Sequence, residues 1–286
     1  TVYGLAADAT APEAVAAIYA AKGRPAHNPL IVHVPDLATA QTLATLPAQA
    51  ATLARAFWPR PLTLVLPLKP GNGLAPAVTA GLPTVAIRVP AHPAMQAVLR
   101  RVKGPVAAPS ANPSGRISAT TPAHVRDGLG DRVAAILDAG PCAVGVESTI
   151  LAPGENTTRL LREGGLPREA IEPFTGPLIA DTTPGAKLEA PGQLASHYAP
   201  RAPLHIGGTP QPREITIGFG PTSGDLTLSP TGDLEEAATK LFAILHEADA
   251  LAAQRNAPAI RVAAIPDTGL GRAINDRLRR AAAPRD

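Results

Sequence analysis

The apolar residues of the first 173 positions recur at helical spacing in some segments and form short strand-like runs in others. Val15, Ile18 and Tyr19 predict a helix that ends at Lys22, and Thr10–Glu13 before them forms a capping-box pattern. Other helices are predicted at Asp36–Phe57 with a break at Pro47, at His92–Val102 and around Arg168–Ile171. Strands are predicted at Ile31–Val34, Leu62–Leu66, Thr84–Val89, Pro105–Pro109, Val133–Leu137, Val146–Leu151 and Arg159–Arg162. This alternation without a strict βαβ rhythm predicts an α/β domain with a mixed sheet.

The pattern changes after residue 173. Residues 174–202 are rich in Pro and Gly and lack periodicity, which is typical of a linker or a functional lid. A second set of strands and helices follows at Leu204–Ile206, Ile215–Phe219, Leu234–Gln254, Ile260–Ile265 and Gly271–Ala281. We therefore predict a catalytic domain over 1–173, a linker or lid over 174–202 and a small α/β domain over 203–286. Thr1–Leu5 indicates the end of a strand, so we expect that strand to begin before Thr1.

Composition narrows the function classes. Aromatic residues make up only 3% of the chain, which argues against base-stacking platforms for single-stranded nucleic acid. Residues 1–173 carry 15 Lys and Arg against 11 Asp and Glu, a mild excess that suits a small anionic ligand better than RNA. The single cysteine, Cys142, excludes an intrachain disulfide and a cysteine-rich zinc site. No apolar run approaches the roughly 20 residues of a membrane helix, so we expect a soluble, cytoplasmic protein.

The stretch Lys22–Leu30 concentrates chemistry between a predicted helix and a predicted strand. Lys22 continues the apolar row of its helix, and Arg24 lies two residues on in a Gly-Pro bend with Asn28 nearby. Two such cations can converge on one phosphate or carboxylate. The alternative is that both simply occupy a helix C-terminus, where cations are favoured.

Other candidates are scattered, because both common glycine-rich phosphate loops are missing. Arg88 lies on one face of its strand with Thr84, and it needs either an anionic ligand or a structural acid. Three more candidates have plain structural alternatives: Ser110–Asn112 as an Asx turn, Ser148 as the polar face of an edge strand, and His33 as a core histidine. No covalent nucleophile is evident.

Five ordered motifs together carry a family resemblance. They are Thr1–Leu5, Lys22–Pro25 with Asn28–His33, Val85–Pro90, Pro109–Gly115 and Glu147–Thr149. The chain resembles the YrdC-like family of threonylcarbamoyl-AMP synthases, and the connector ending in His197–Pro200 resembles its longer, two-domain form. The resemblance implies a YrdC-like domain with a mixed twisted sheet and flanking helices, then a small Rossmann-like domain. The family's segment before Thr1 is expected to contribute to the threonine pocket.

The resemblance also implies an activity. The family joins L-threonine, bicarbonate or carbon dioxide, and ATP into L-threonylcarbamoyladenylate, releases pyrophosphate, and supplies the product to the tRNA threonylcarbamoyl-transfer machinery. Threonine would contact Thr1, His33, Arg88, Ala108 and Ser148. ATP, with Mg²⁺ on its phosphates, would contact Lys22, Arg24, Asn28, Thr84, Ser110, Asn112, Ser118, Arg162 and Tyr198. Lys22 and Arg24 would be catalytic, and Tyr198 would close over the site with the connector as a lid. After Pro200 the resemblance leads us to expect a smaller polar residue in some relatives, and this chain has Arg201 there.

Two rival functions follow from the same fold. An RNA-binding module without catalysis is disfavoured by the weak charge and few aromatics, so we expect weak or no direct tRNA binding. A carbamoyl-transfer module of hydrogenase maturation enzymes is disfavoured because those modules accompany cysteine-rich zinc motifs.

Overall fold

The computed structural model describes residues 1–180 and 188–284 and divides into two compact units. The large-sheet unit comprises Gly4–Ser110 and Ser148–Gln193. The small-sheet unit comprises Thr1–Tyr3, Ala111–Glu147 and Leu194–Asp286. The predicted domain boundaries after residues 173 and 202 stay predictions, and residues 181–187 of the predicted lid lie outside the described residues.

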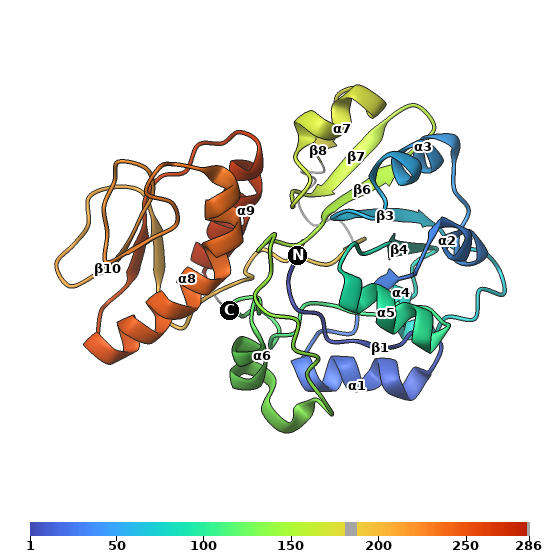
Figure 1. Ribbon diagram of the computed structural model, residues 1–286, viewed down its shortest axis with the longest axis horizontal. Helices are drawn as coiled ribbons and strands as arrows, with labels where there is room; N and C mark the ends of the chain where they lie inside the picture. Colours follow the sequence, from blue (N-terminus) through green and yellow to red (C-terminus); the bar gives the residue numbers. More distant parts are fainter. Residues whose placement is uncertain (181–187, 285–286) are drawn as a thin grey trace. The chain divides into compact units, whose positions relative to one another are not determined.

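Within the described residues, the large-sheet unit contains a mixed sheet (Figure 1). Its eight strands follow the order β1-β5-β2-β4-β3-β6-β7-β8. Three neighbouring pairs are parallel, β2 with β4, β3 with β6 and β7 with β8, and the other pairs are antiparallel. The strands are β1 Ala7–Asp8, β2 Ile31–His33, β3 Leu62–Pro67, β4 Thr84–Arg88, β5 Val106–Ala107, β6 Thr149–Pro153, β7 Thr158–Arg162 and β8 Ile179–Ala180. The predicted mixed α/β architecture is therefore confirmed.

Alternate residues of these strands face two different clusters. The main core contains Val32, Leu64, Val85, Ile87 and Leu151, with residues from the helices of this unit. The residues between them, Ile31, Val65, Ala86 and Ile150, form a smaller cluster with Ala190 on the other face. Both faces of the central strands are thus covered. The period-two prediction for β4 is confirmed, because Val85 and Ile87 face the main core and Ala86 does not.

The helices of this unit are α1 Pro12–Lys22, α2 Leu37–Leu43, α3 Ala48–Phe57, α4 Pro76–Thr79, α5 Pro93–Val102 and α7 Arg168–Thr175. Asp36 caps α2 through the backbone N–H of Thr39, as the sequence indicates. The predicted capping box at α1 is wrong. Asp8 Oδ1 accepts hydrogen bonds from both the backbone N–H and the hydroxyl of Thr10, so α1 begins without a side-chain cap. Gly23 ends α1 with φ of 60°, the left-handed conformation that glycine adopts most readily.

The small-sheet unit contains a parallel sheet of four strands in the order β11-β10-β12-β9. The elements of this unit are α6 Pro122–Leu129, β9 Leu204–Ile206, β10 Ile215–Gly218, β11 Leu226–Thr227, α8 Leu234–Arg255, β12 Ile260–Val262 and α9 Leu270–Ala282, with a 3-10 turn at Gly130–Arg132. Helices α8 and α9 pack against each other and against this sheet (Figure 1). Ile215, Ile260 and Leu204 are aligned across the strands and buried. The small α/β fold predicted here is confirmed.

Of the two strands predicted in the segment that leads to β6, one does not form and the other begins later than predicted. The predicted strand Val133–Leu137 does not form, and Leu137 is 60% exposed. An exposed segment gains little from β-branched residues, since strand propensity reflects packing on a half-buried surface. The strand predicted at Val146–Leu151 begins at Thr149, as β6. Helix α6 was not predicted, although Thr121 caps it and Pro122 starts it, a signal that the sequence carries.

No helix in the described part of the chain combines the length and apolar character needed to cross a membrane.

Candidate active site

A row of polar side chains crosses the centre of the large sheet. Arg88 of β4 is aligned with His33 of β2 on one side and with Thr63 of β3 on the other. Since His33 and Thr63 alternate with the core residues Val32 and Leu64, these side chains share the face opposite the main core. Thr63 was missed by sequence reasoning. Its signal was the alternation of Leu62, Leu64 and Leu66 around a polar residue.

Ser148 and Arg162 extend this row. The Ser148 hydroxyl is 2.7 Å from the Thr63 hydroxyl, and both residues are buried. Arg162 of β7 donates to Ser148 through Nε and Nη2 to the backbone carbonyl, at 3.1 and 2.8 Å, and through Nη2 to the hydroxyl at 3.2 Å. Ser148 therefore lies among Thr63 and Arg162, outside β6, and not in an exposed edge strand.

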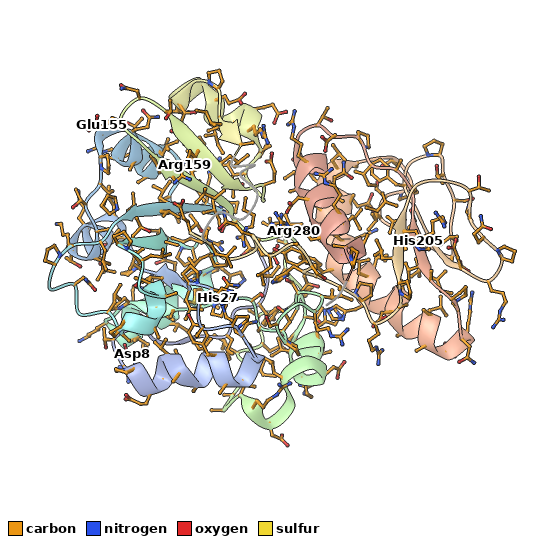
Figure 2. The ribbon with its side chains drawn as sticks, turned by 180° about the vertical axis from the view of Figure 1, so that it is seen from behind. Asp8, His27, Glu155, Arg159, His205 and Arg280 are labelled. Atoms are coloured by element: carbon orange, nitrogen blue, oxygen red, sulfur yellow. The ribbon has the colours of Figure 1, made fainter. Side chains whose placement is uncertain are left out.

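Part of the predicted lid packs on the same face of the sheet. Ala190 is fully buried in the small cluster there, and the carbonyl of Pro191 accepts a hydrogen bond from Arg162 at 3.2 Å. Arg159, on β7 in Figure 2, forms a bidentate pair with Glu189 at 3.1 and 2.7 Å. These contacts hold residues 189–191 over β7.

The charges in the row shift two pKa values. Burial and the positive charge of Arg88 lower the pKa of His33 to about 3, so this imidazole is neutral at physiological pH. Burial and the charge of Arg162 lower the pKa of Arg88 to about 10, so Arg88 remains protonated. Two nearby guanidinium groups beside a neutral histidine and two hydroxyls suit a ligand with a carboxylate and polar groups.

A second cluster gathers Lys22, Arg24 and Asn28. Lys22 occupies the last turn of α1, as in the helix C-terminus alternative, but it and Arg24 are only 3% and 9% exposed. Lys22 Nζ donates to the carbonyl of Ser110 at 2.5 Å. Arg24 donates to the carbonyls of Asn28 and Pro29 and, at 2.6 Å, to Asn28 Oδ1. Arg24 therefore also braces the loop that carries Asn28.

The amide of Asn28 is an available donor in this cluster. Asn28 is fully buried, and its Nδ2 atom lacks a hydrogen-bond partner within the described residues. Buried polar groups are rarely left without a partner. Because Arg24 occupies Oδ1, the amide nitrogen can offer its hydrogens to an acceptor such as a phosphate oxygen.

The other candidates of the large-sheet unit lie on nearby strands. Thr84 begins β4, on the face that carries Arg88. The backbone N–H of Ala108 donates to the carbonyl of Ile31 in β2 at 3.0 Å, and Ser110 forms an isolated antiparallel bridge with Gly4. This unit therefore contains Lys22, Arg24, Asn28, His33, Thr84, Arg88, Ala108, Ser110, Ser148 and Arg162.

The small-sheet unit contains Thr1, Asn112, Ser118 and Tyr198. Asn112 donates to the carbonyls of Pro113 and Arg116, both at 2.9 Å, and so closes its own loop, as in the turn interpretation. Ser118 is fully buried and donates to Glu147 Oε1 at 2.6 Å. Tyr198 is 1% exposed, with its ring near Phe242.

Arg201 lies at the end of the connector, and the structure shows what it contacts. Its backbone N–H and its guanidinium Nε donate to Asp249 at 2.7 and 2.9 Å. Arg201 thus anchors the chain to α8. The ligand roles assigned to the individual residues of both units stay predictions.

The side chains of the site indicate whether a metal ion would bind to the protein directly or through the nucleotide phosphates. The described residues contain no group of three or more His, Cys, Asp or Glu side chains that could hold a metal ion. The cluster of Lys22, Arg24 and Asn28 consists of cations and an amide, which suit phosphate oxygens rather than a bare cation. These residues fit magnesium that arrives on nucleotide phosphates.

Comparisons with known proteins find relatives that span this chain. A Sua5/YciO/YrdC family model, described as telomere recombination, matches residues 1–164, and a model of the threonylcarbamoyl-AMP synthase C-terminal domain matches residues 166–283. A Bacillus subtilis threonylcarbamoyl-AMP synthase is 42% identical over 309 residues, 100% of this chain and 88% of the relative. One from Pyrococcus abyssi is 37% identical over 304 residues, 98% of this chain and 88% of the relative.

A solved structure shows the same architecture. The crystal structure of P. abyssi Sua5 complexed with L-threonine matches with a TM-score of 0.88 and 36% identity, and covers 99% of this chain and 88% of that chain. The resemblance that the motifs carry is confirmed over both domains. The chain belongs to the threonylcarbamoyl-AMP synthase family, in its two-domain form.

Proposed function

We propose that this chain synthesises L-threonylcarbamoyladenylate from L-threonine, bicarbonate or carbon dioxide, and ATP, with release of pyrophosphate. The proposal is supported by its family and by the L-threonine complex of P. abyssi Sua5. The observation that carries it is the row of His33, Arg88 and Thr63 across the sheet, extended by Ser148. This row offers a cation, a neutral imidazole and hydroxyls, the groups that an amino acid with a hydroxyl side chain requires.

In this proposal the row binds threonine. The guanidinium of Arg88 pairs with the carboxylate through two parallel hydrogen bonds. His33 and Ser148 hydrogen-bond the polar groups of the substrate, and Thr63 orients the Ser148 hydroxyl. Because the pKa of His33 is lowered to about 3, its ring binds without adding charge beside the substrate ammonium group. Thr1 and the backbone of Ala108 complete the threonine contacts that the family resemblance implies.

ATP is bound in this proposal by the residues that the resemblance implies: Lys22, Arg24, Asn28, Thr84, Ser110, Asn112, Ser118, Arg162 and Tyr198. The buried cations Lys22 and Arg24 offset phosphate charge, and Asn28 Nδ2 donates to an acceptor of the nucleotide. Mg²⁺ bound to the phosphates would neutralise charge on the departing pyrophosphate.

The chemistry needs alignment rather than a protein nucleophile. The threonine amine loses a proton and attacks the carbon of carbon dioxide, which gives the carbamate. A carbamate oxygen then attacks the α-phosphorus of ATP, and the bond to pyrophosphate breaks. Both steps gain from positioned reactants and from preorganised positive charge. We further propose that the protein acts in the cytoplasm and supplies its product to the machinery that transfers threonylcarbamoyl groups to tRNA.

Mass spectrometry tests the proposed function directly. The protein is incubated with Mg²⁺-ATP, bicarbonate and L-threonine, and threonylcarbamoyladenylate and pyrophosphate are measured, with each substrate omitted in turn. Lys22→Met should abolish product, whereas Lys103→Met should not, because Lys103 also ends a helix but is exposed. Folded wild-type protein that forms no product would refute the proposal. Pyrophosphate release without threonine would refute the choice of substrate.

A further inference from the structure

A buried ion pair links the last helix to the segment that precedes β6. Arg277 of α9 is fully buried, and its Nε atom lies 2.9 Å from Glu147 Oε2. Its Nη1 atom also pairs with Asp276 at 2.7 Å. A fully buried guanidinium is rarely tolerated without such opposite charges, so this position of α9 is closely tied to Glu147.

The second oxygen of Glu147 determines how Ser118 can hydrogen-bond. Ser118 Oγ lies 2.6 Å from Glu147 Oε1, and both residues are buried. An ionised carboxylate only accepts hydrogen bonds, so the single hydroxyl hydrogen of Ser118 points to Glu147. Toward any ligand, Ser118 is therefore an acceptor and not a donor. Phosphate oxygens are acceptors too, so they do not match it.

The same helix fixes the end of the connector. The Arg277 guanidinium lies over the Tyr198 ring, 5.2 Å from its centroid, and the Tyr198 backbone has a φ of 61°. A non-glycine residue holds that conformation only where its surroundings enforce it. Arg280, labelled in Figure 2, donates to the carbonyl of Leu194, and its own carbonyl accepts from the backbone N–H of His197. Helix α9 thus holds residues 194–198.

Helix α8 holds the segment that carries Ser118 and Glu147. A Cβ atom at Gly145 would lie 2.2 Å from the carbonyl oxygen of Ala238, so the two backbones pass each other closely. His246 Nε2 also lies 3.1 Å from the carbonyl oxygen of Ser118. Helix α8 therefore holds the backbone at both ends of the Ser118–Glu147 hydrogen bond. Helix α9, through Arg277, determines that Ser118 is the donor in that hydrogen bond.

We propose that Arg277 and Glu147 are positioning residues for the nucleotide: through them α9 orients Ser118 to accept a hydrogen bond from a ribose hydroxyl or the adenine amino group. The inference rests on the proposed function, because Ser118 is assigned to ATP there. It adds that the C-terminal domain sets nucleotide affinity and specificity without contacting the reacting atoms.

The first test reverses the direction of the hydrogen bond between Ser118 and residue 147. In Glu147→Gln, an isosteric change, the amide oxygen faces Arg277 and the amide N–H₂ donates to Ser118. The Ser118 hydroxyl then turns its hydrogen toward the ligand. The KM for ATP should rise about five- to tenfold, the loss expected for one hydrogen bond. Arg279→Met, a control on the exposed side of α9, should leave kcat and KM unchanged.

Two variants that remove charges distinguish an effect on the position of Ser118 from an effect on the stability of the fold. Arg277→Met removes a buried positive partner of Glu147, so the melting temperature should fall. The double variant with Glu147→Gln removes both charges of this pair and should regain most of that melting temperature. Its KM for ATP should nevertheless stay at least fivefold above wild type, because Ser118 is no longer held in one orientation. A folded double variant with the wild-type KM would overturn the proposal.

Nucleotide analogues identify which group of ATP donates the hydrogen bond to Ser118. Wild-type protein should discriminate against one of 2′-deoxy-ATP, 3′-deoxy-ATP or purine riboside triphosphate by about fivefold or more in kcat/KM. Ser118→Ala should erase that discrimination. Equal use of ATP and all three analogues by wild-type protein would overturn the inference while leaving the synthase activity established. Absence of wild-type turnover would instead overturn the proposed function, and the inference with it.

Discussion

Replacing Arg88 by Met should stabilise the free protein while it impairs the enzyme. Burial and the charge of Arg162 lower the pKa of Arg88 to about 10, so folding disfavours its charged form. A shift of that size corresponds to on the order of 3 kcal/mol at neutral pH. Because the side chain keeps partial solvent exposure, we expect about 1–2 kcal/mol of stabilisation when the charge is removed.

The same change should weaken threonine binding. Each hydrogen bond from a charged donor contributes about 1.5–3 kcal/mol, so losing both bonds of the fork to the carboxylate should raise the KM for threonine by at least about a hundredfold. Denaturant unfolding measures the first effect, and initial rates at varied threonine measure the second. Arg101→Met, on the exposed surface of α5, is the matched control and should change neither quantity.

Two outcomes would refute the reasoning about Arg88. A folded Arg88→Met protein with the wild-type KM for threonine would remove this guanidinium from the substrate site. A variant that is less stable than wild type would also refute it. That result would show that the contacts of Arg88 stabilise the fold by more than its burial and its repulsion from Arg162 destabilise it. Arg88→Lys keeps the charge but loses the fork, so it should impair threonine binding without the gain in stability.

Three further predictions concern neighbouring residues. The pKa of His33 is about 3 in the folded protein, and its ordinary value is 6.5. Between these pH values only the unfolded state binds this proton, so the free energy of unfolding decreases as the pH is lowered. His33→Gln should reduce that slope by about 1.4 kcal/mol per pH unit in urea titrations. Thr63→Val should cost about 1 kcal/mol of stability and raise the KM for threonine several-fold, with the KM for ATP unchanged as the internal control. Asn28→Asp replaces a buried donor by a negative charge and should weaken ATP binding at least tenfold in calorimetry, whereas unchanged binding would exclude Asn28 from a phosphate contact.

Local patterns in the sequence were sufficient for most of the elements and for the candidate residues. The spacing of Val15, Ile18 and Tyr19 predicted a helix that ends at Lys22, and Gly23 ends it there. The alternation of side chains in Thr84–Val89 predicted that Arg88 lies on the same face of its strand as Thr84, opposite Val85 and Ile87. Both signals are local, because helix and strand periodicities are properties of consecutive residues. Val133–Leu137 shows the limit, since its β-branched residues have no surface to pack on.

The sequence by itself also determined the family, because the ordered motifs from Lys22–Pro25 to Glu147–Thr149 occur in one chain. Only the tertiary structure decided which side chains meet. Thr63 joins Ser148 across 85 positions, and Arg277 pairs with Glu147 across 130. Such pairs depend on strand register and on helix packing. These are set by the burial of many residues at once, and no local pattern encodes them.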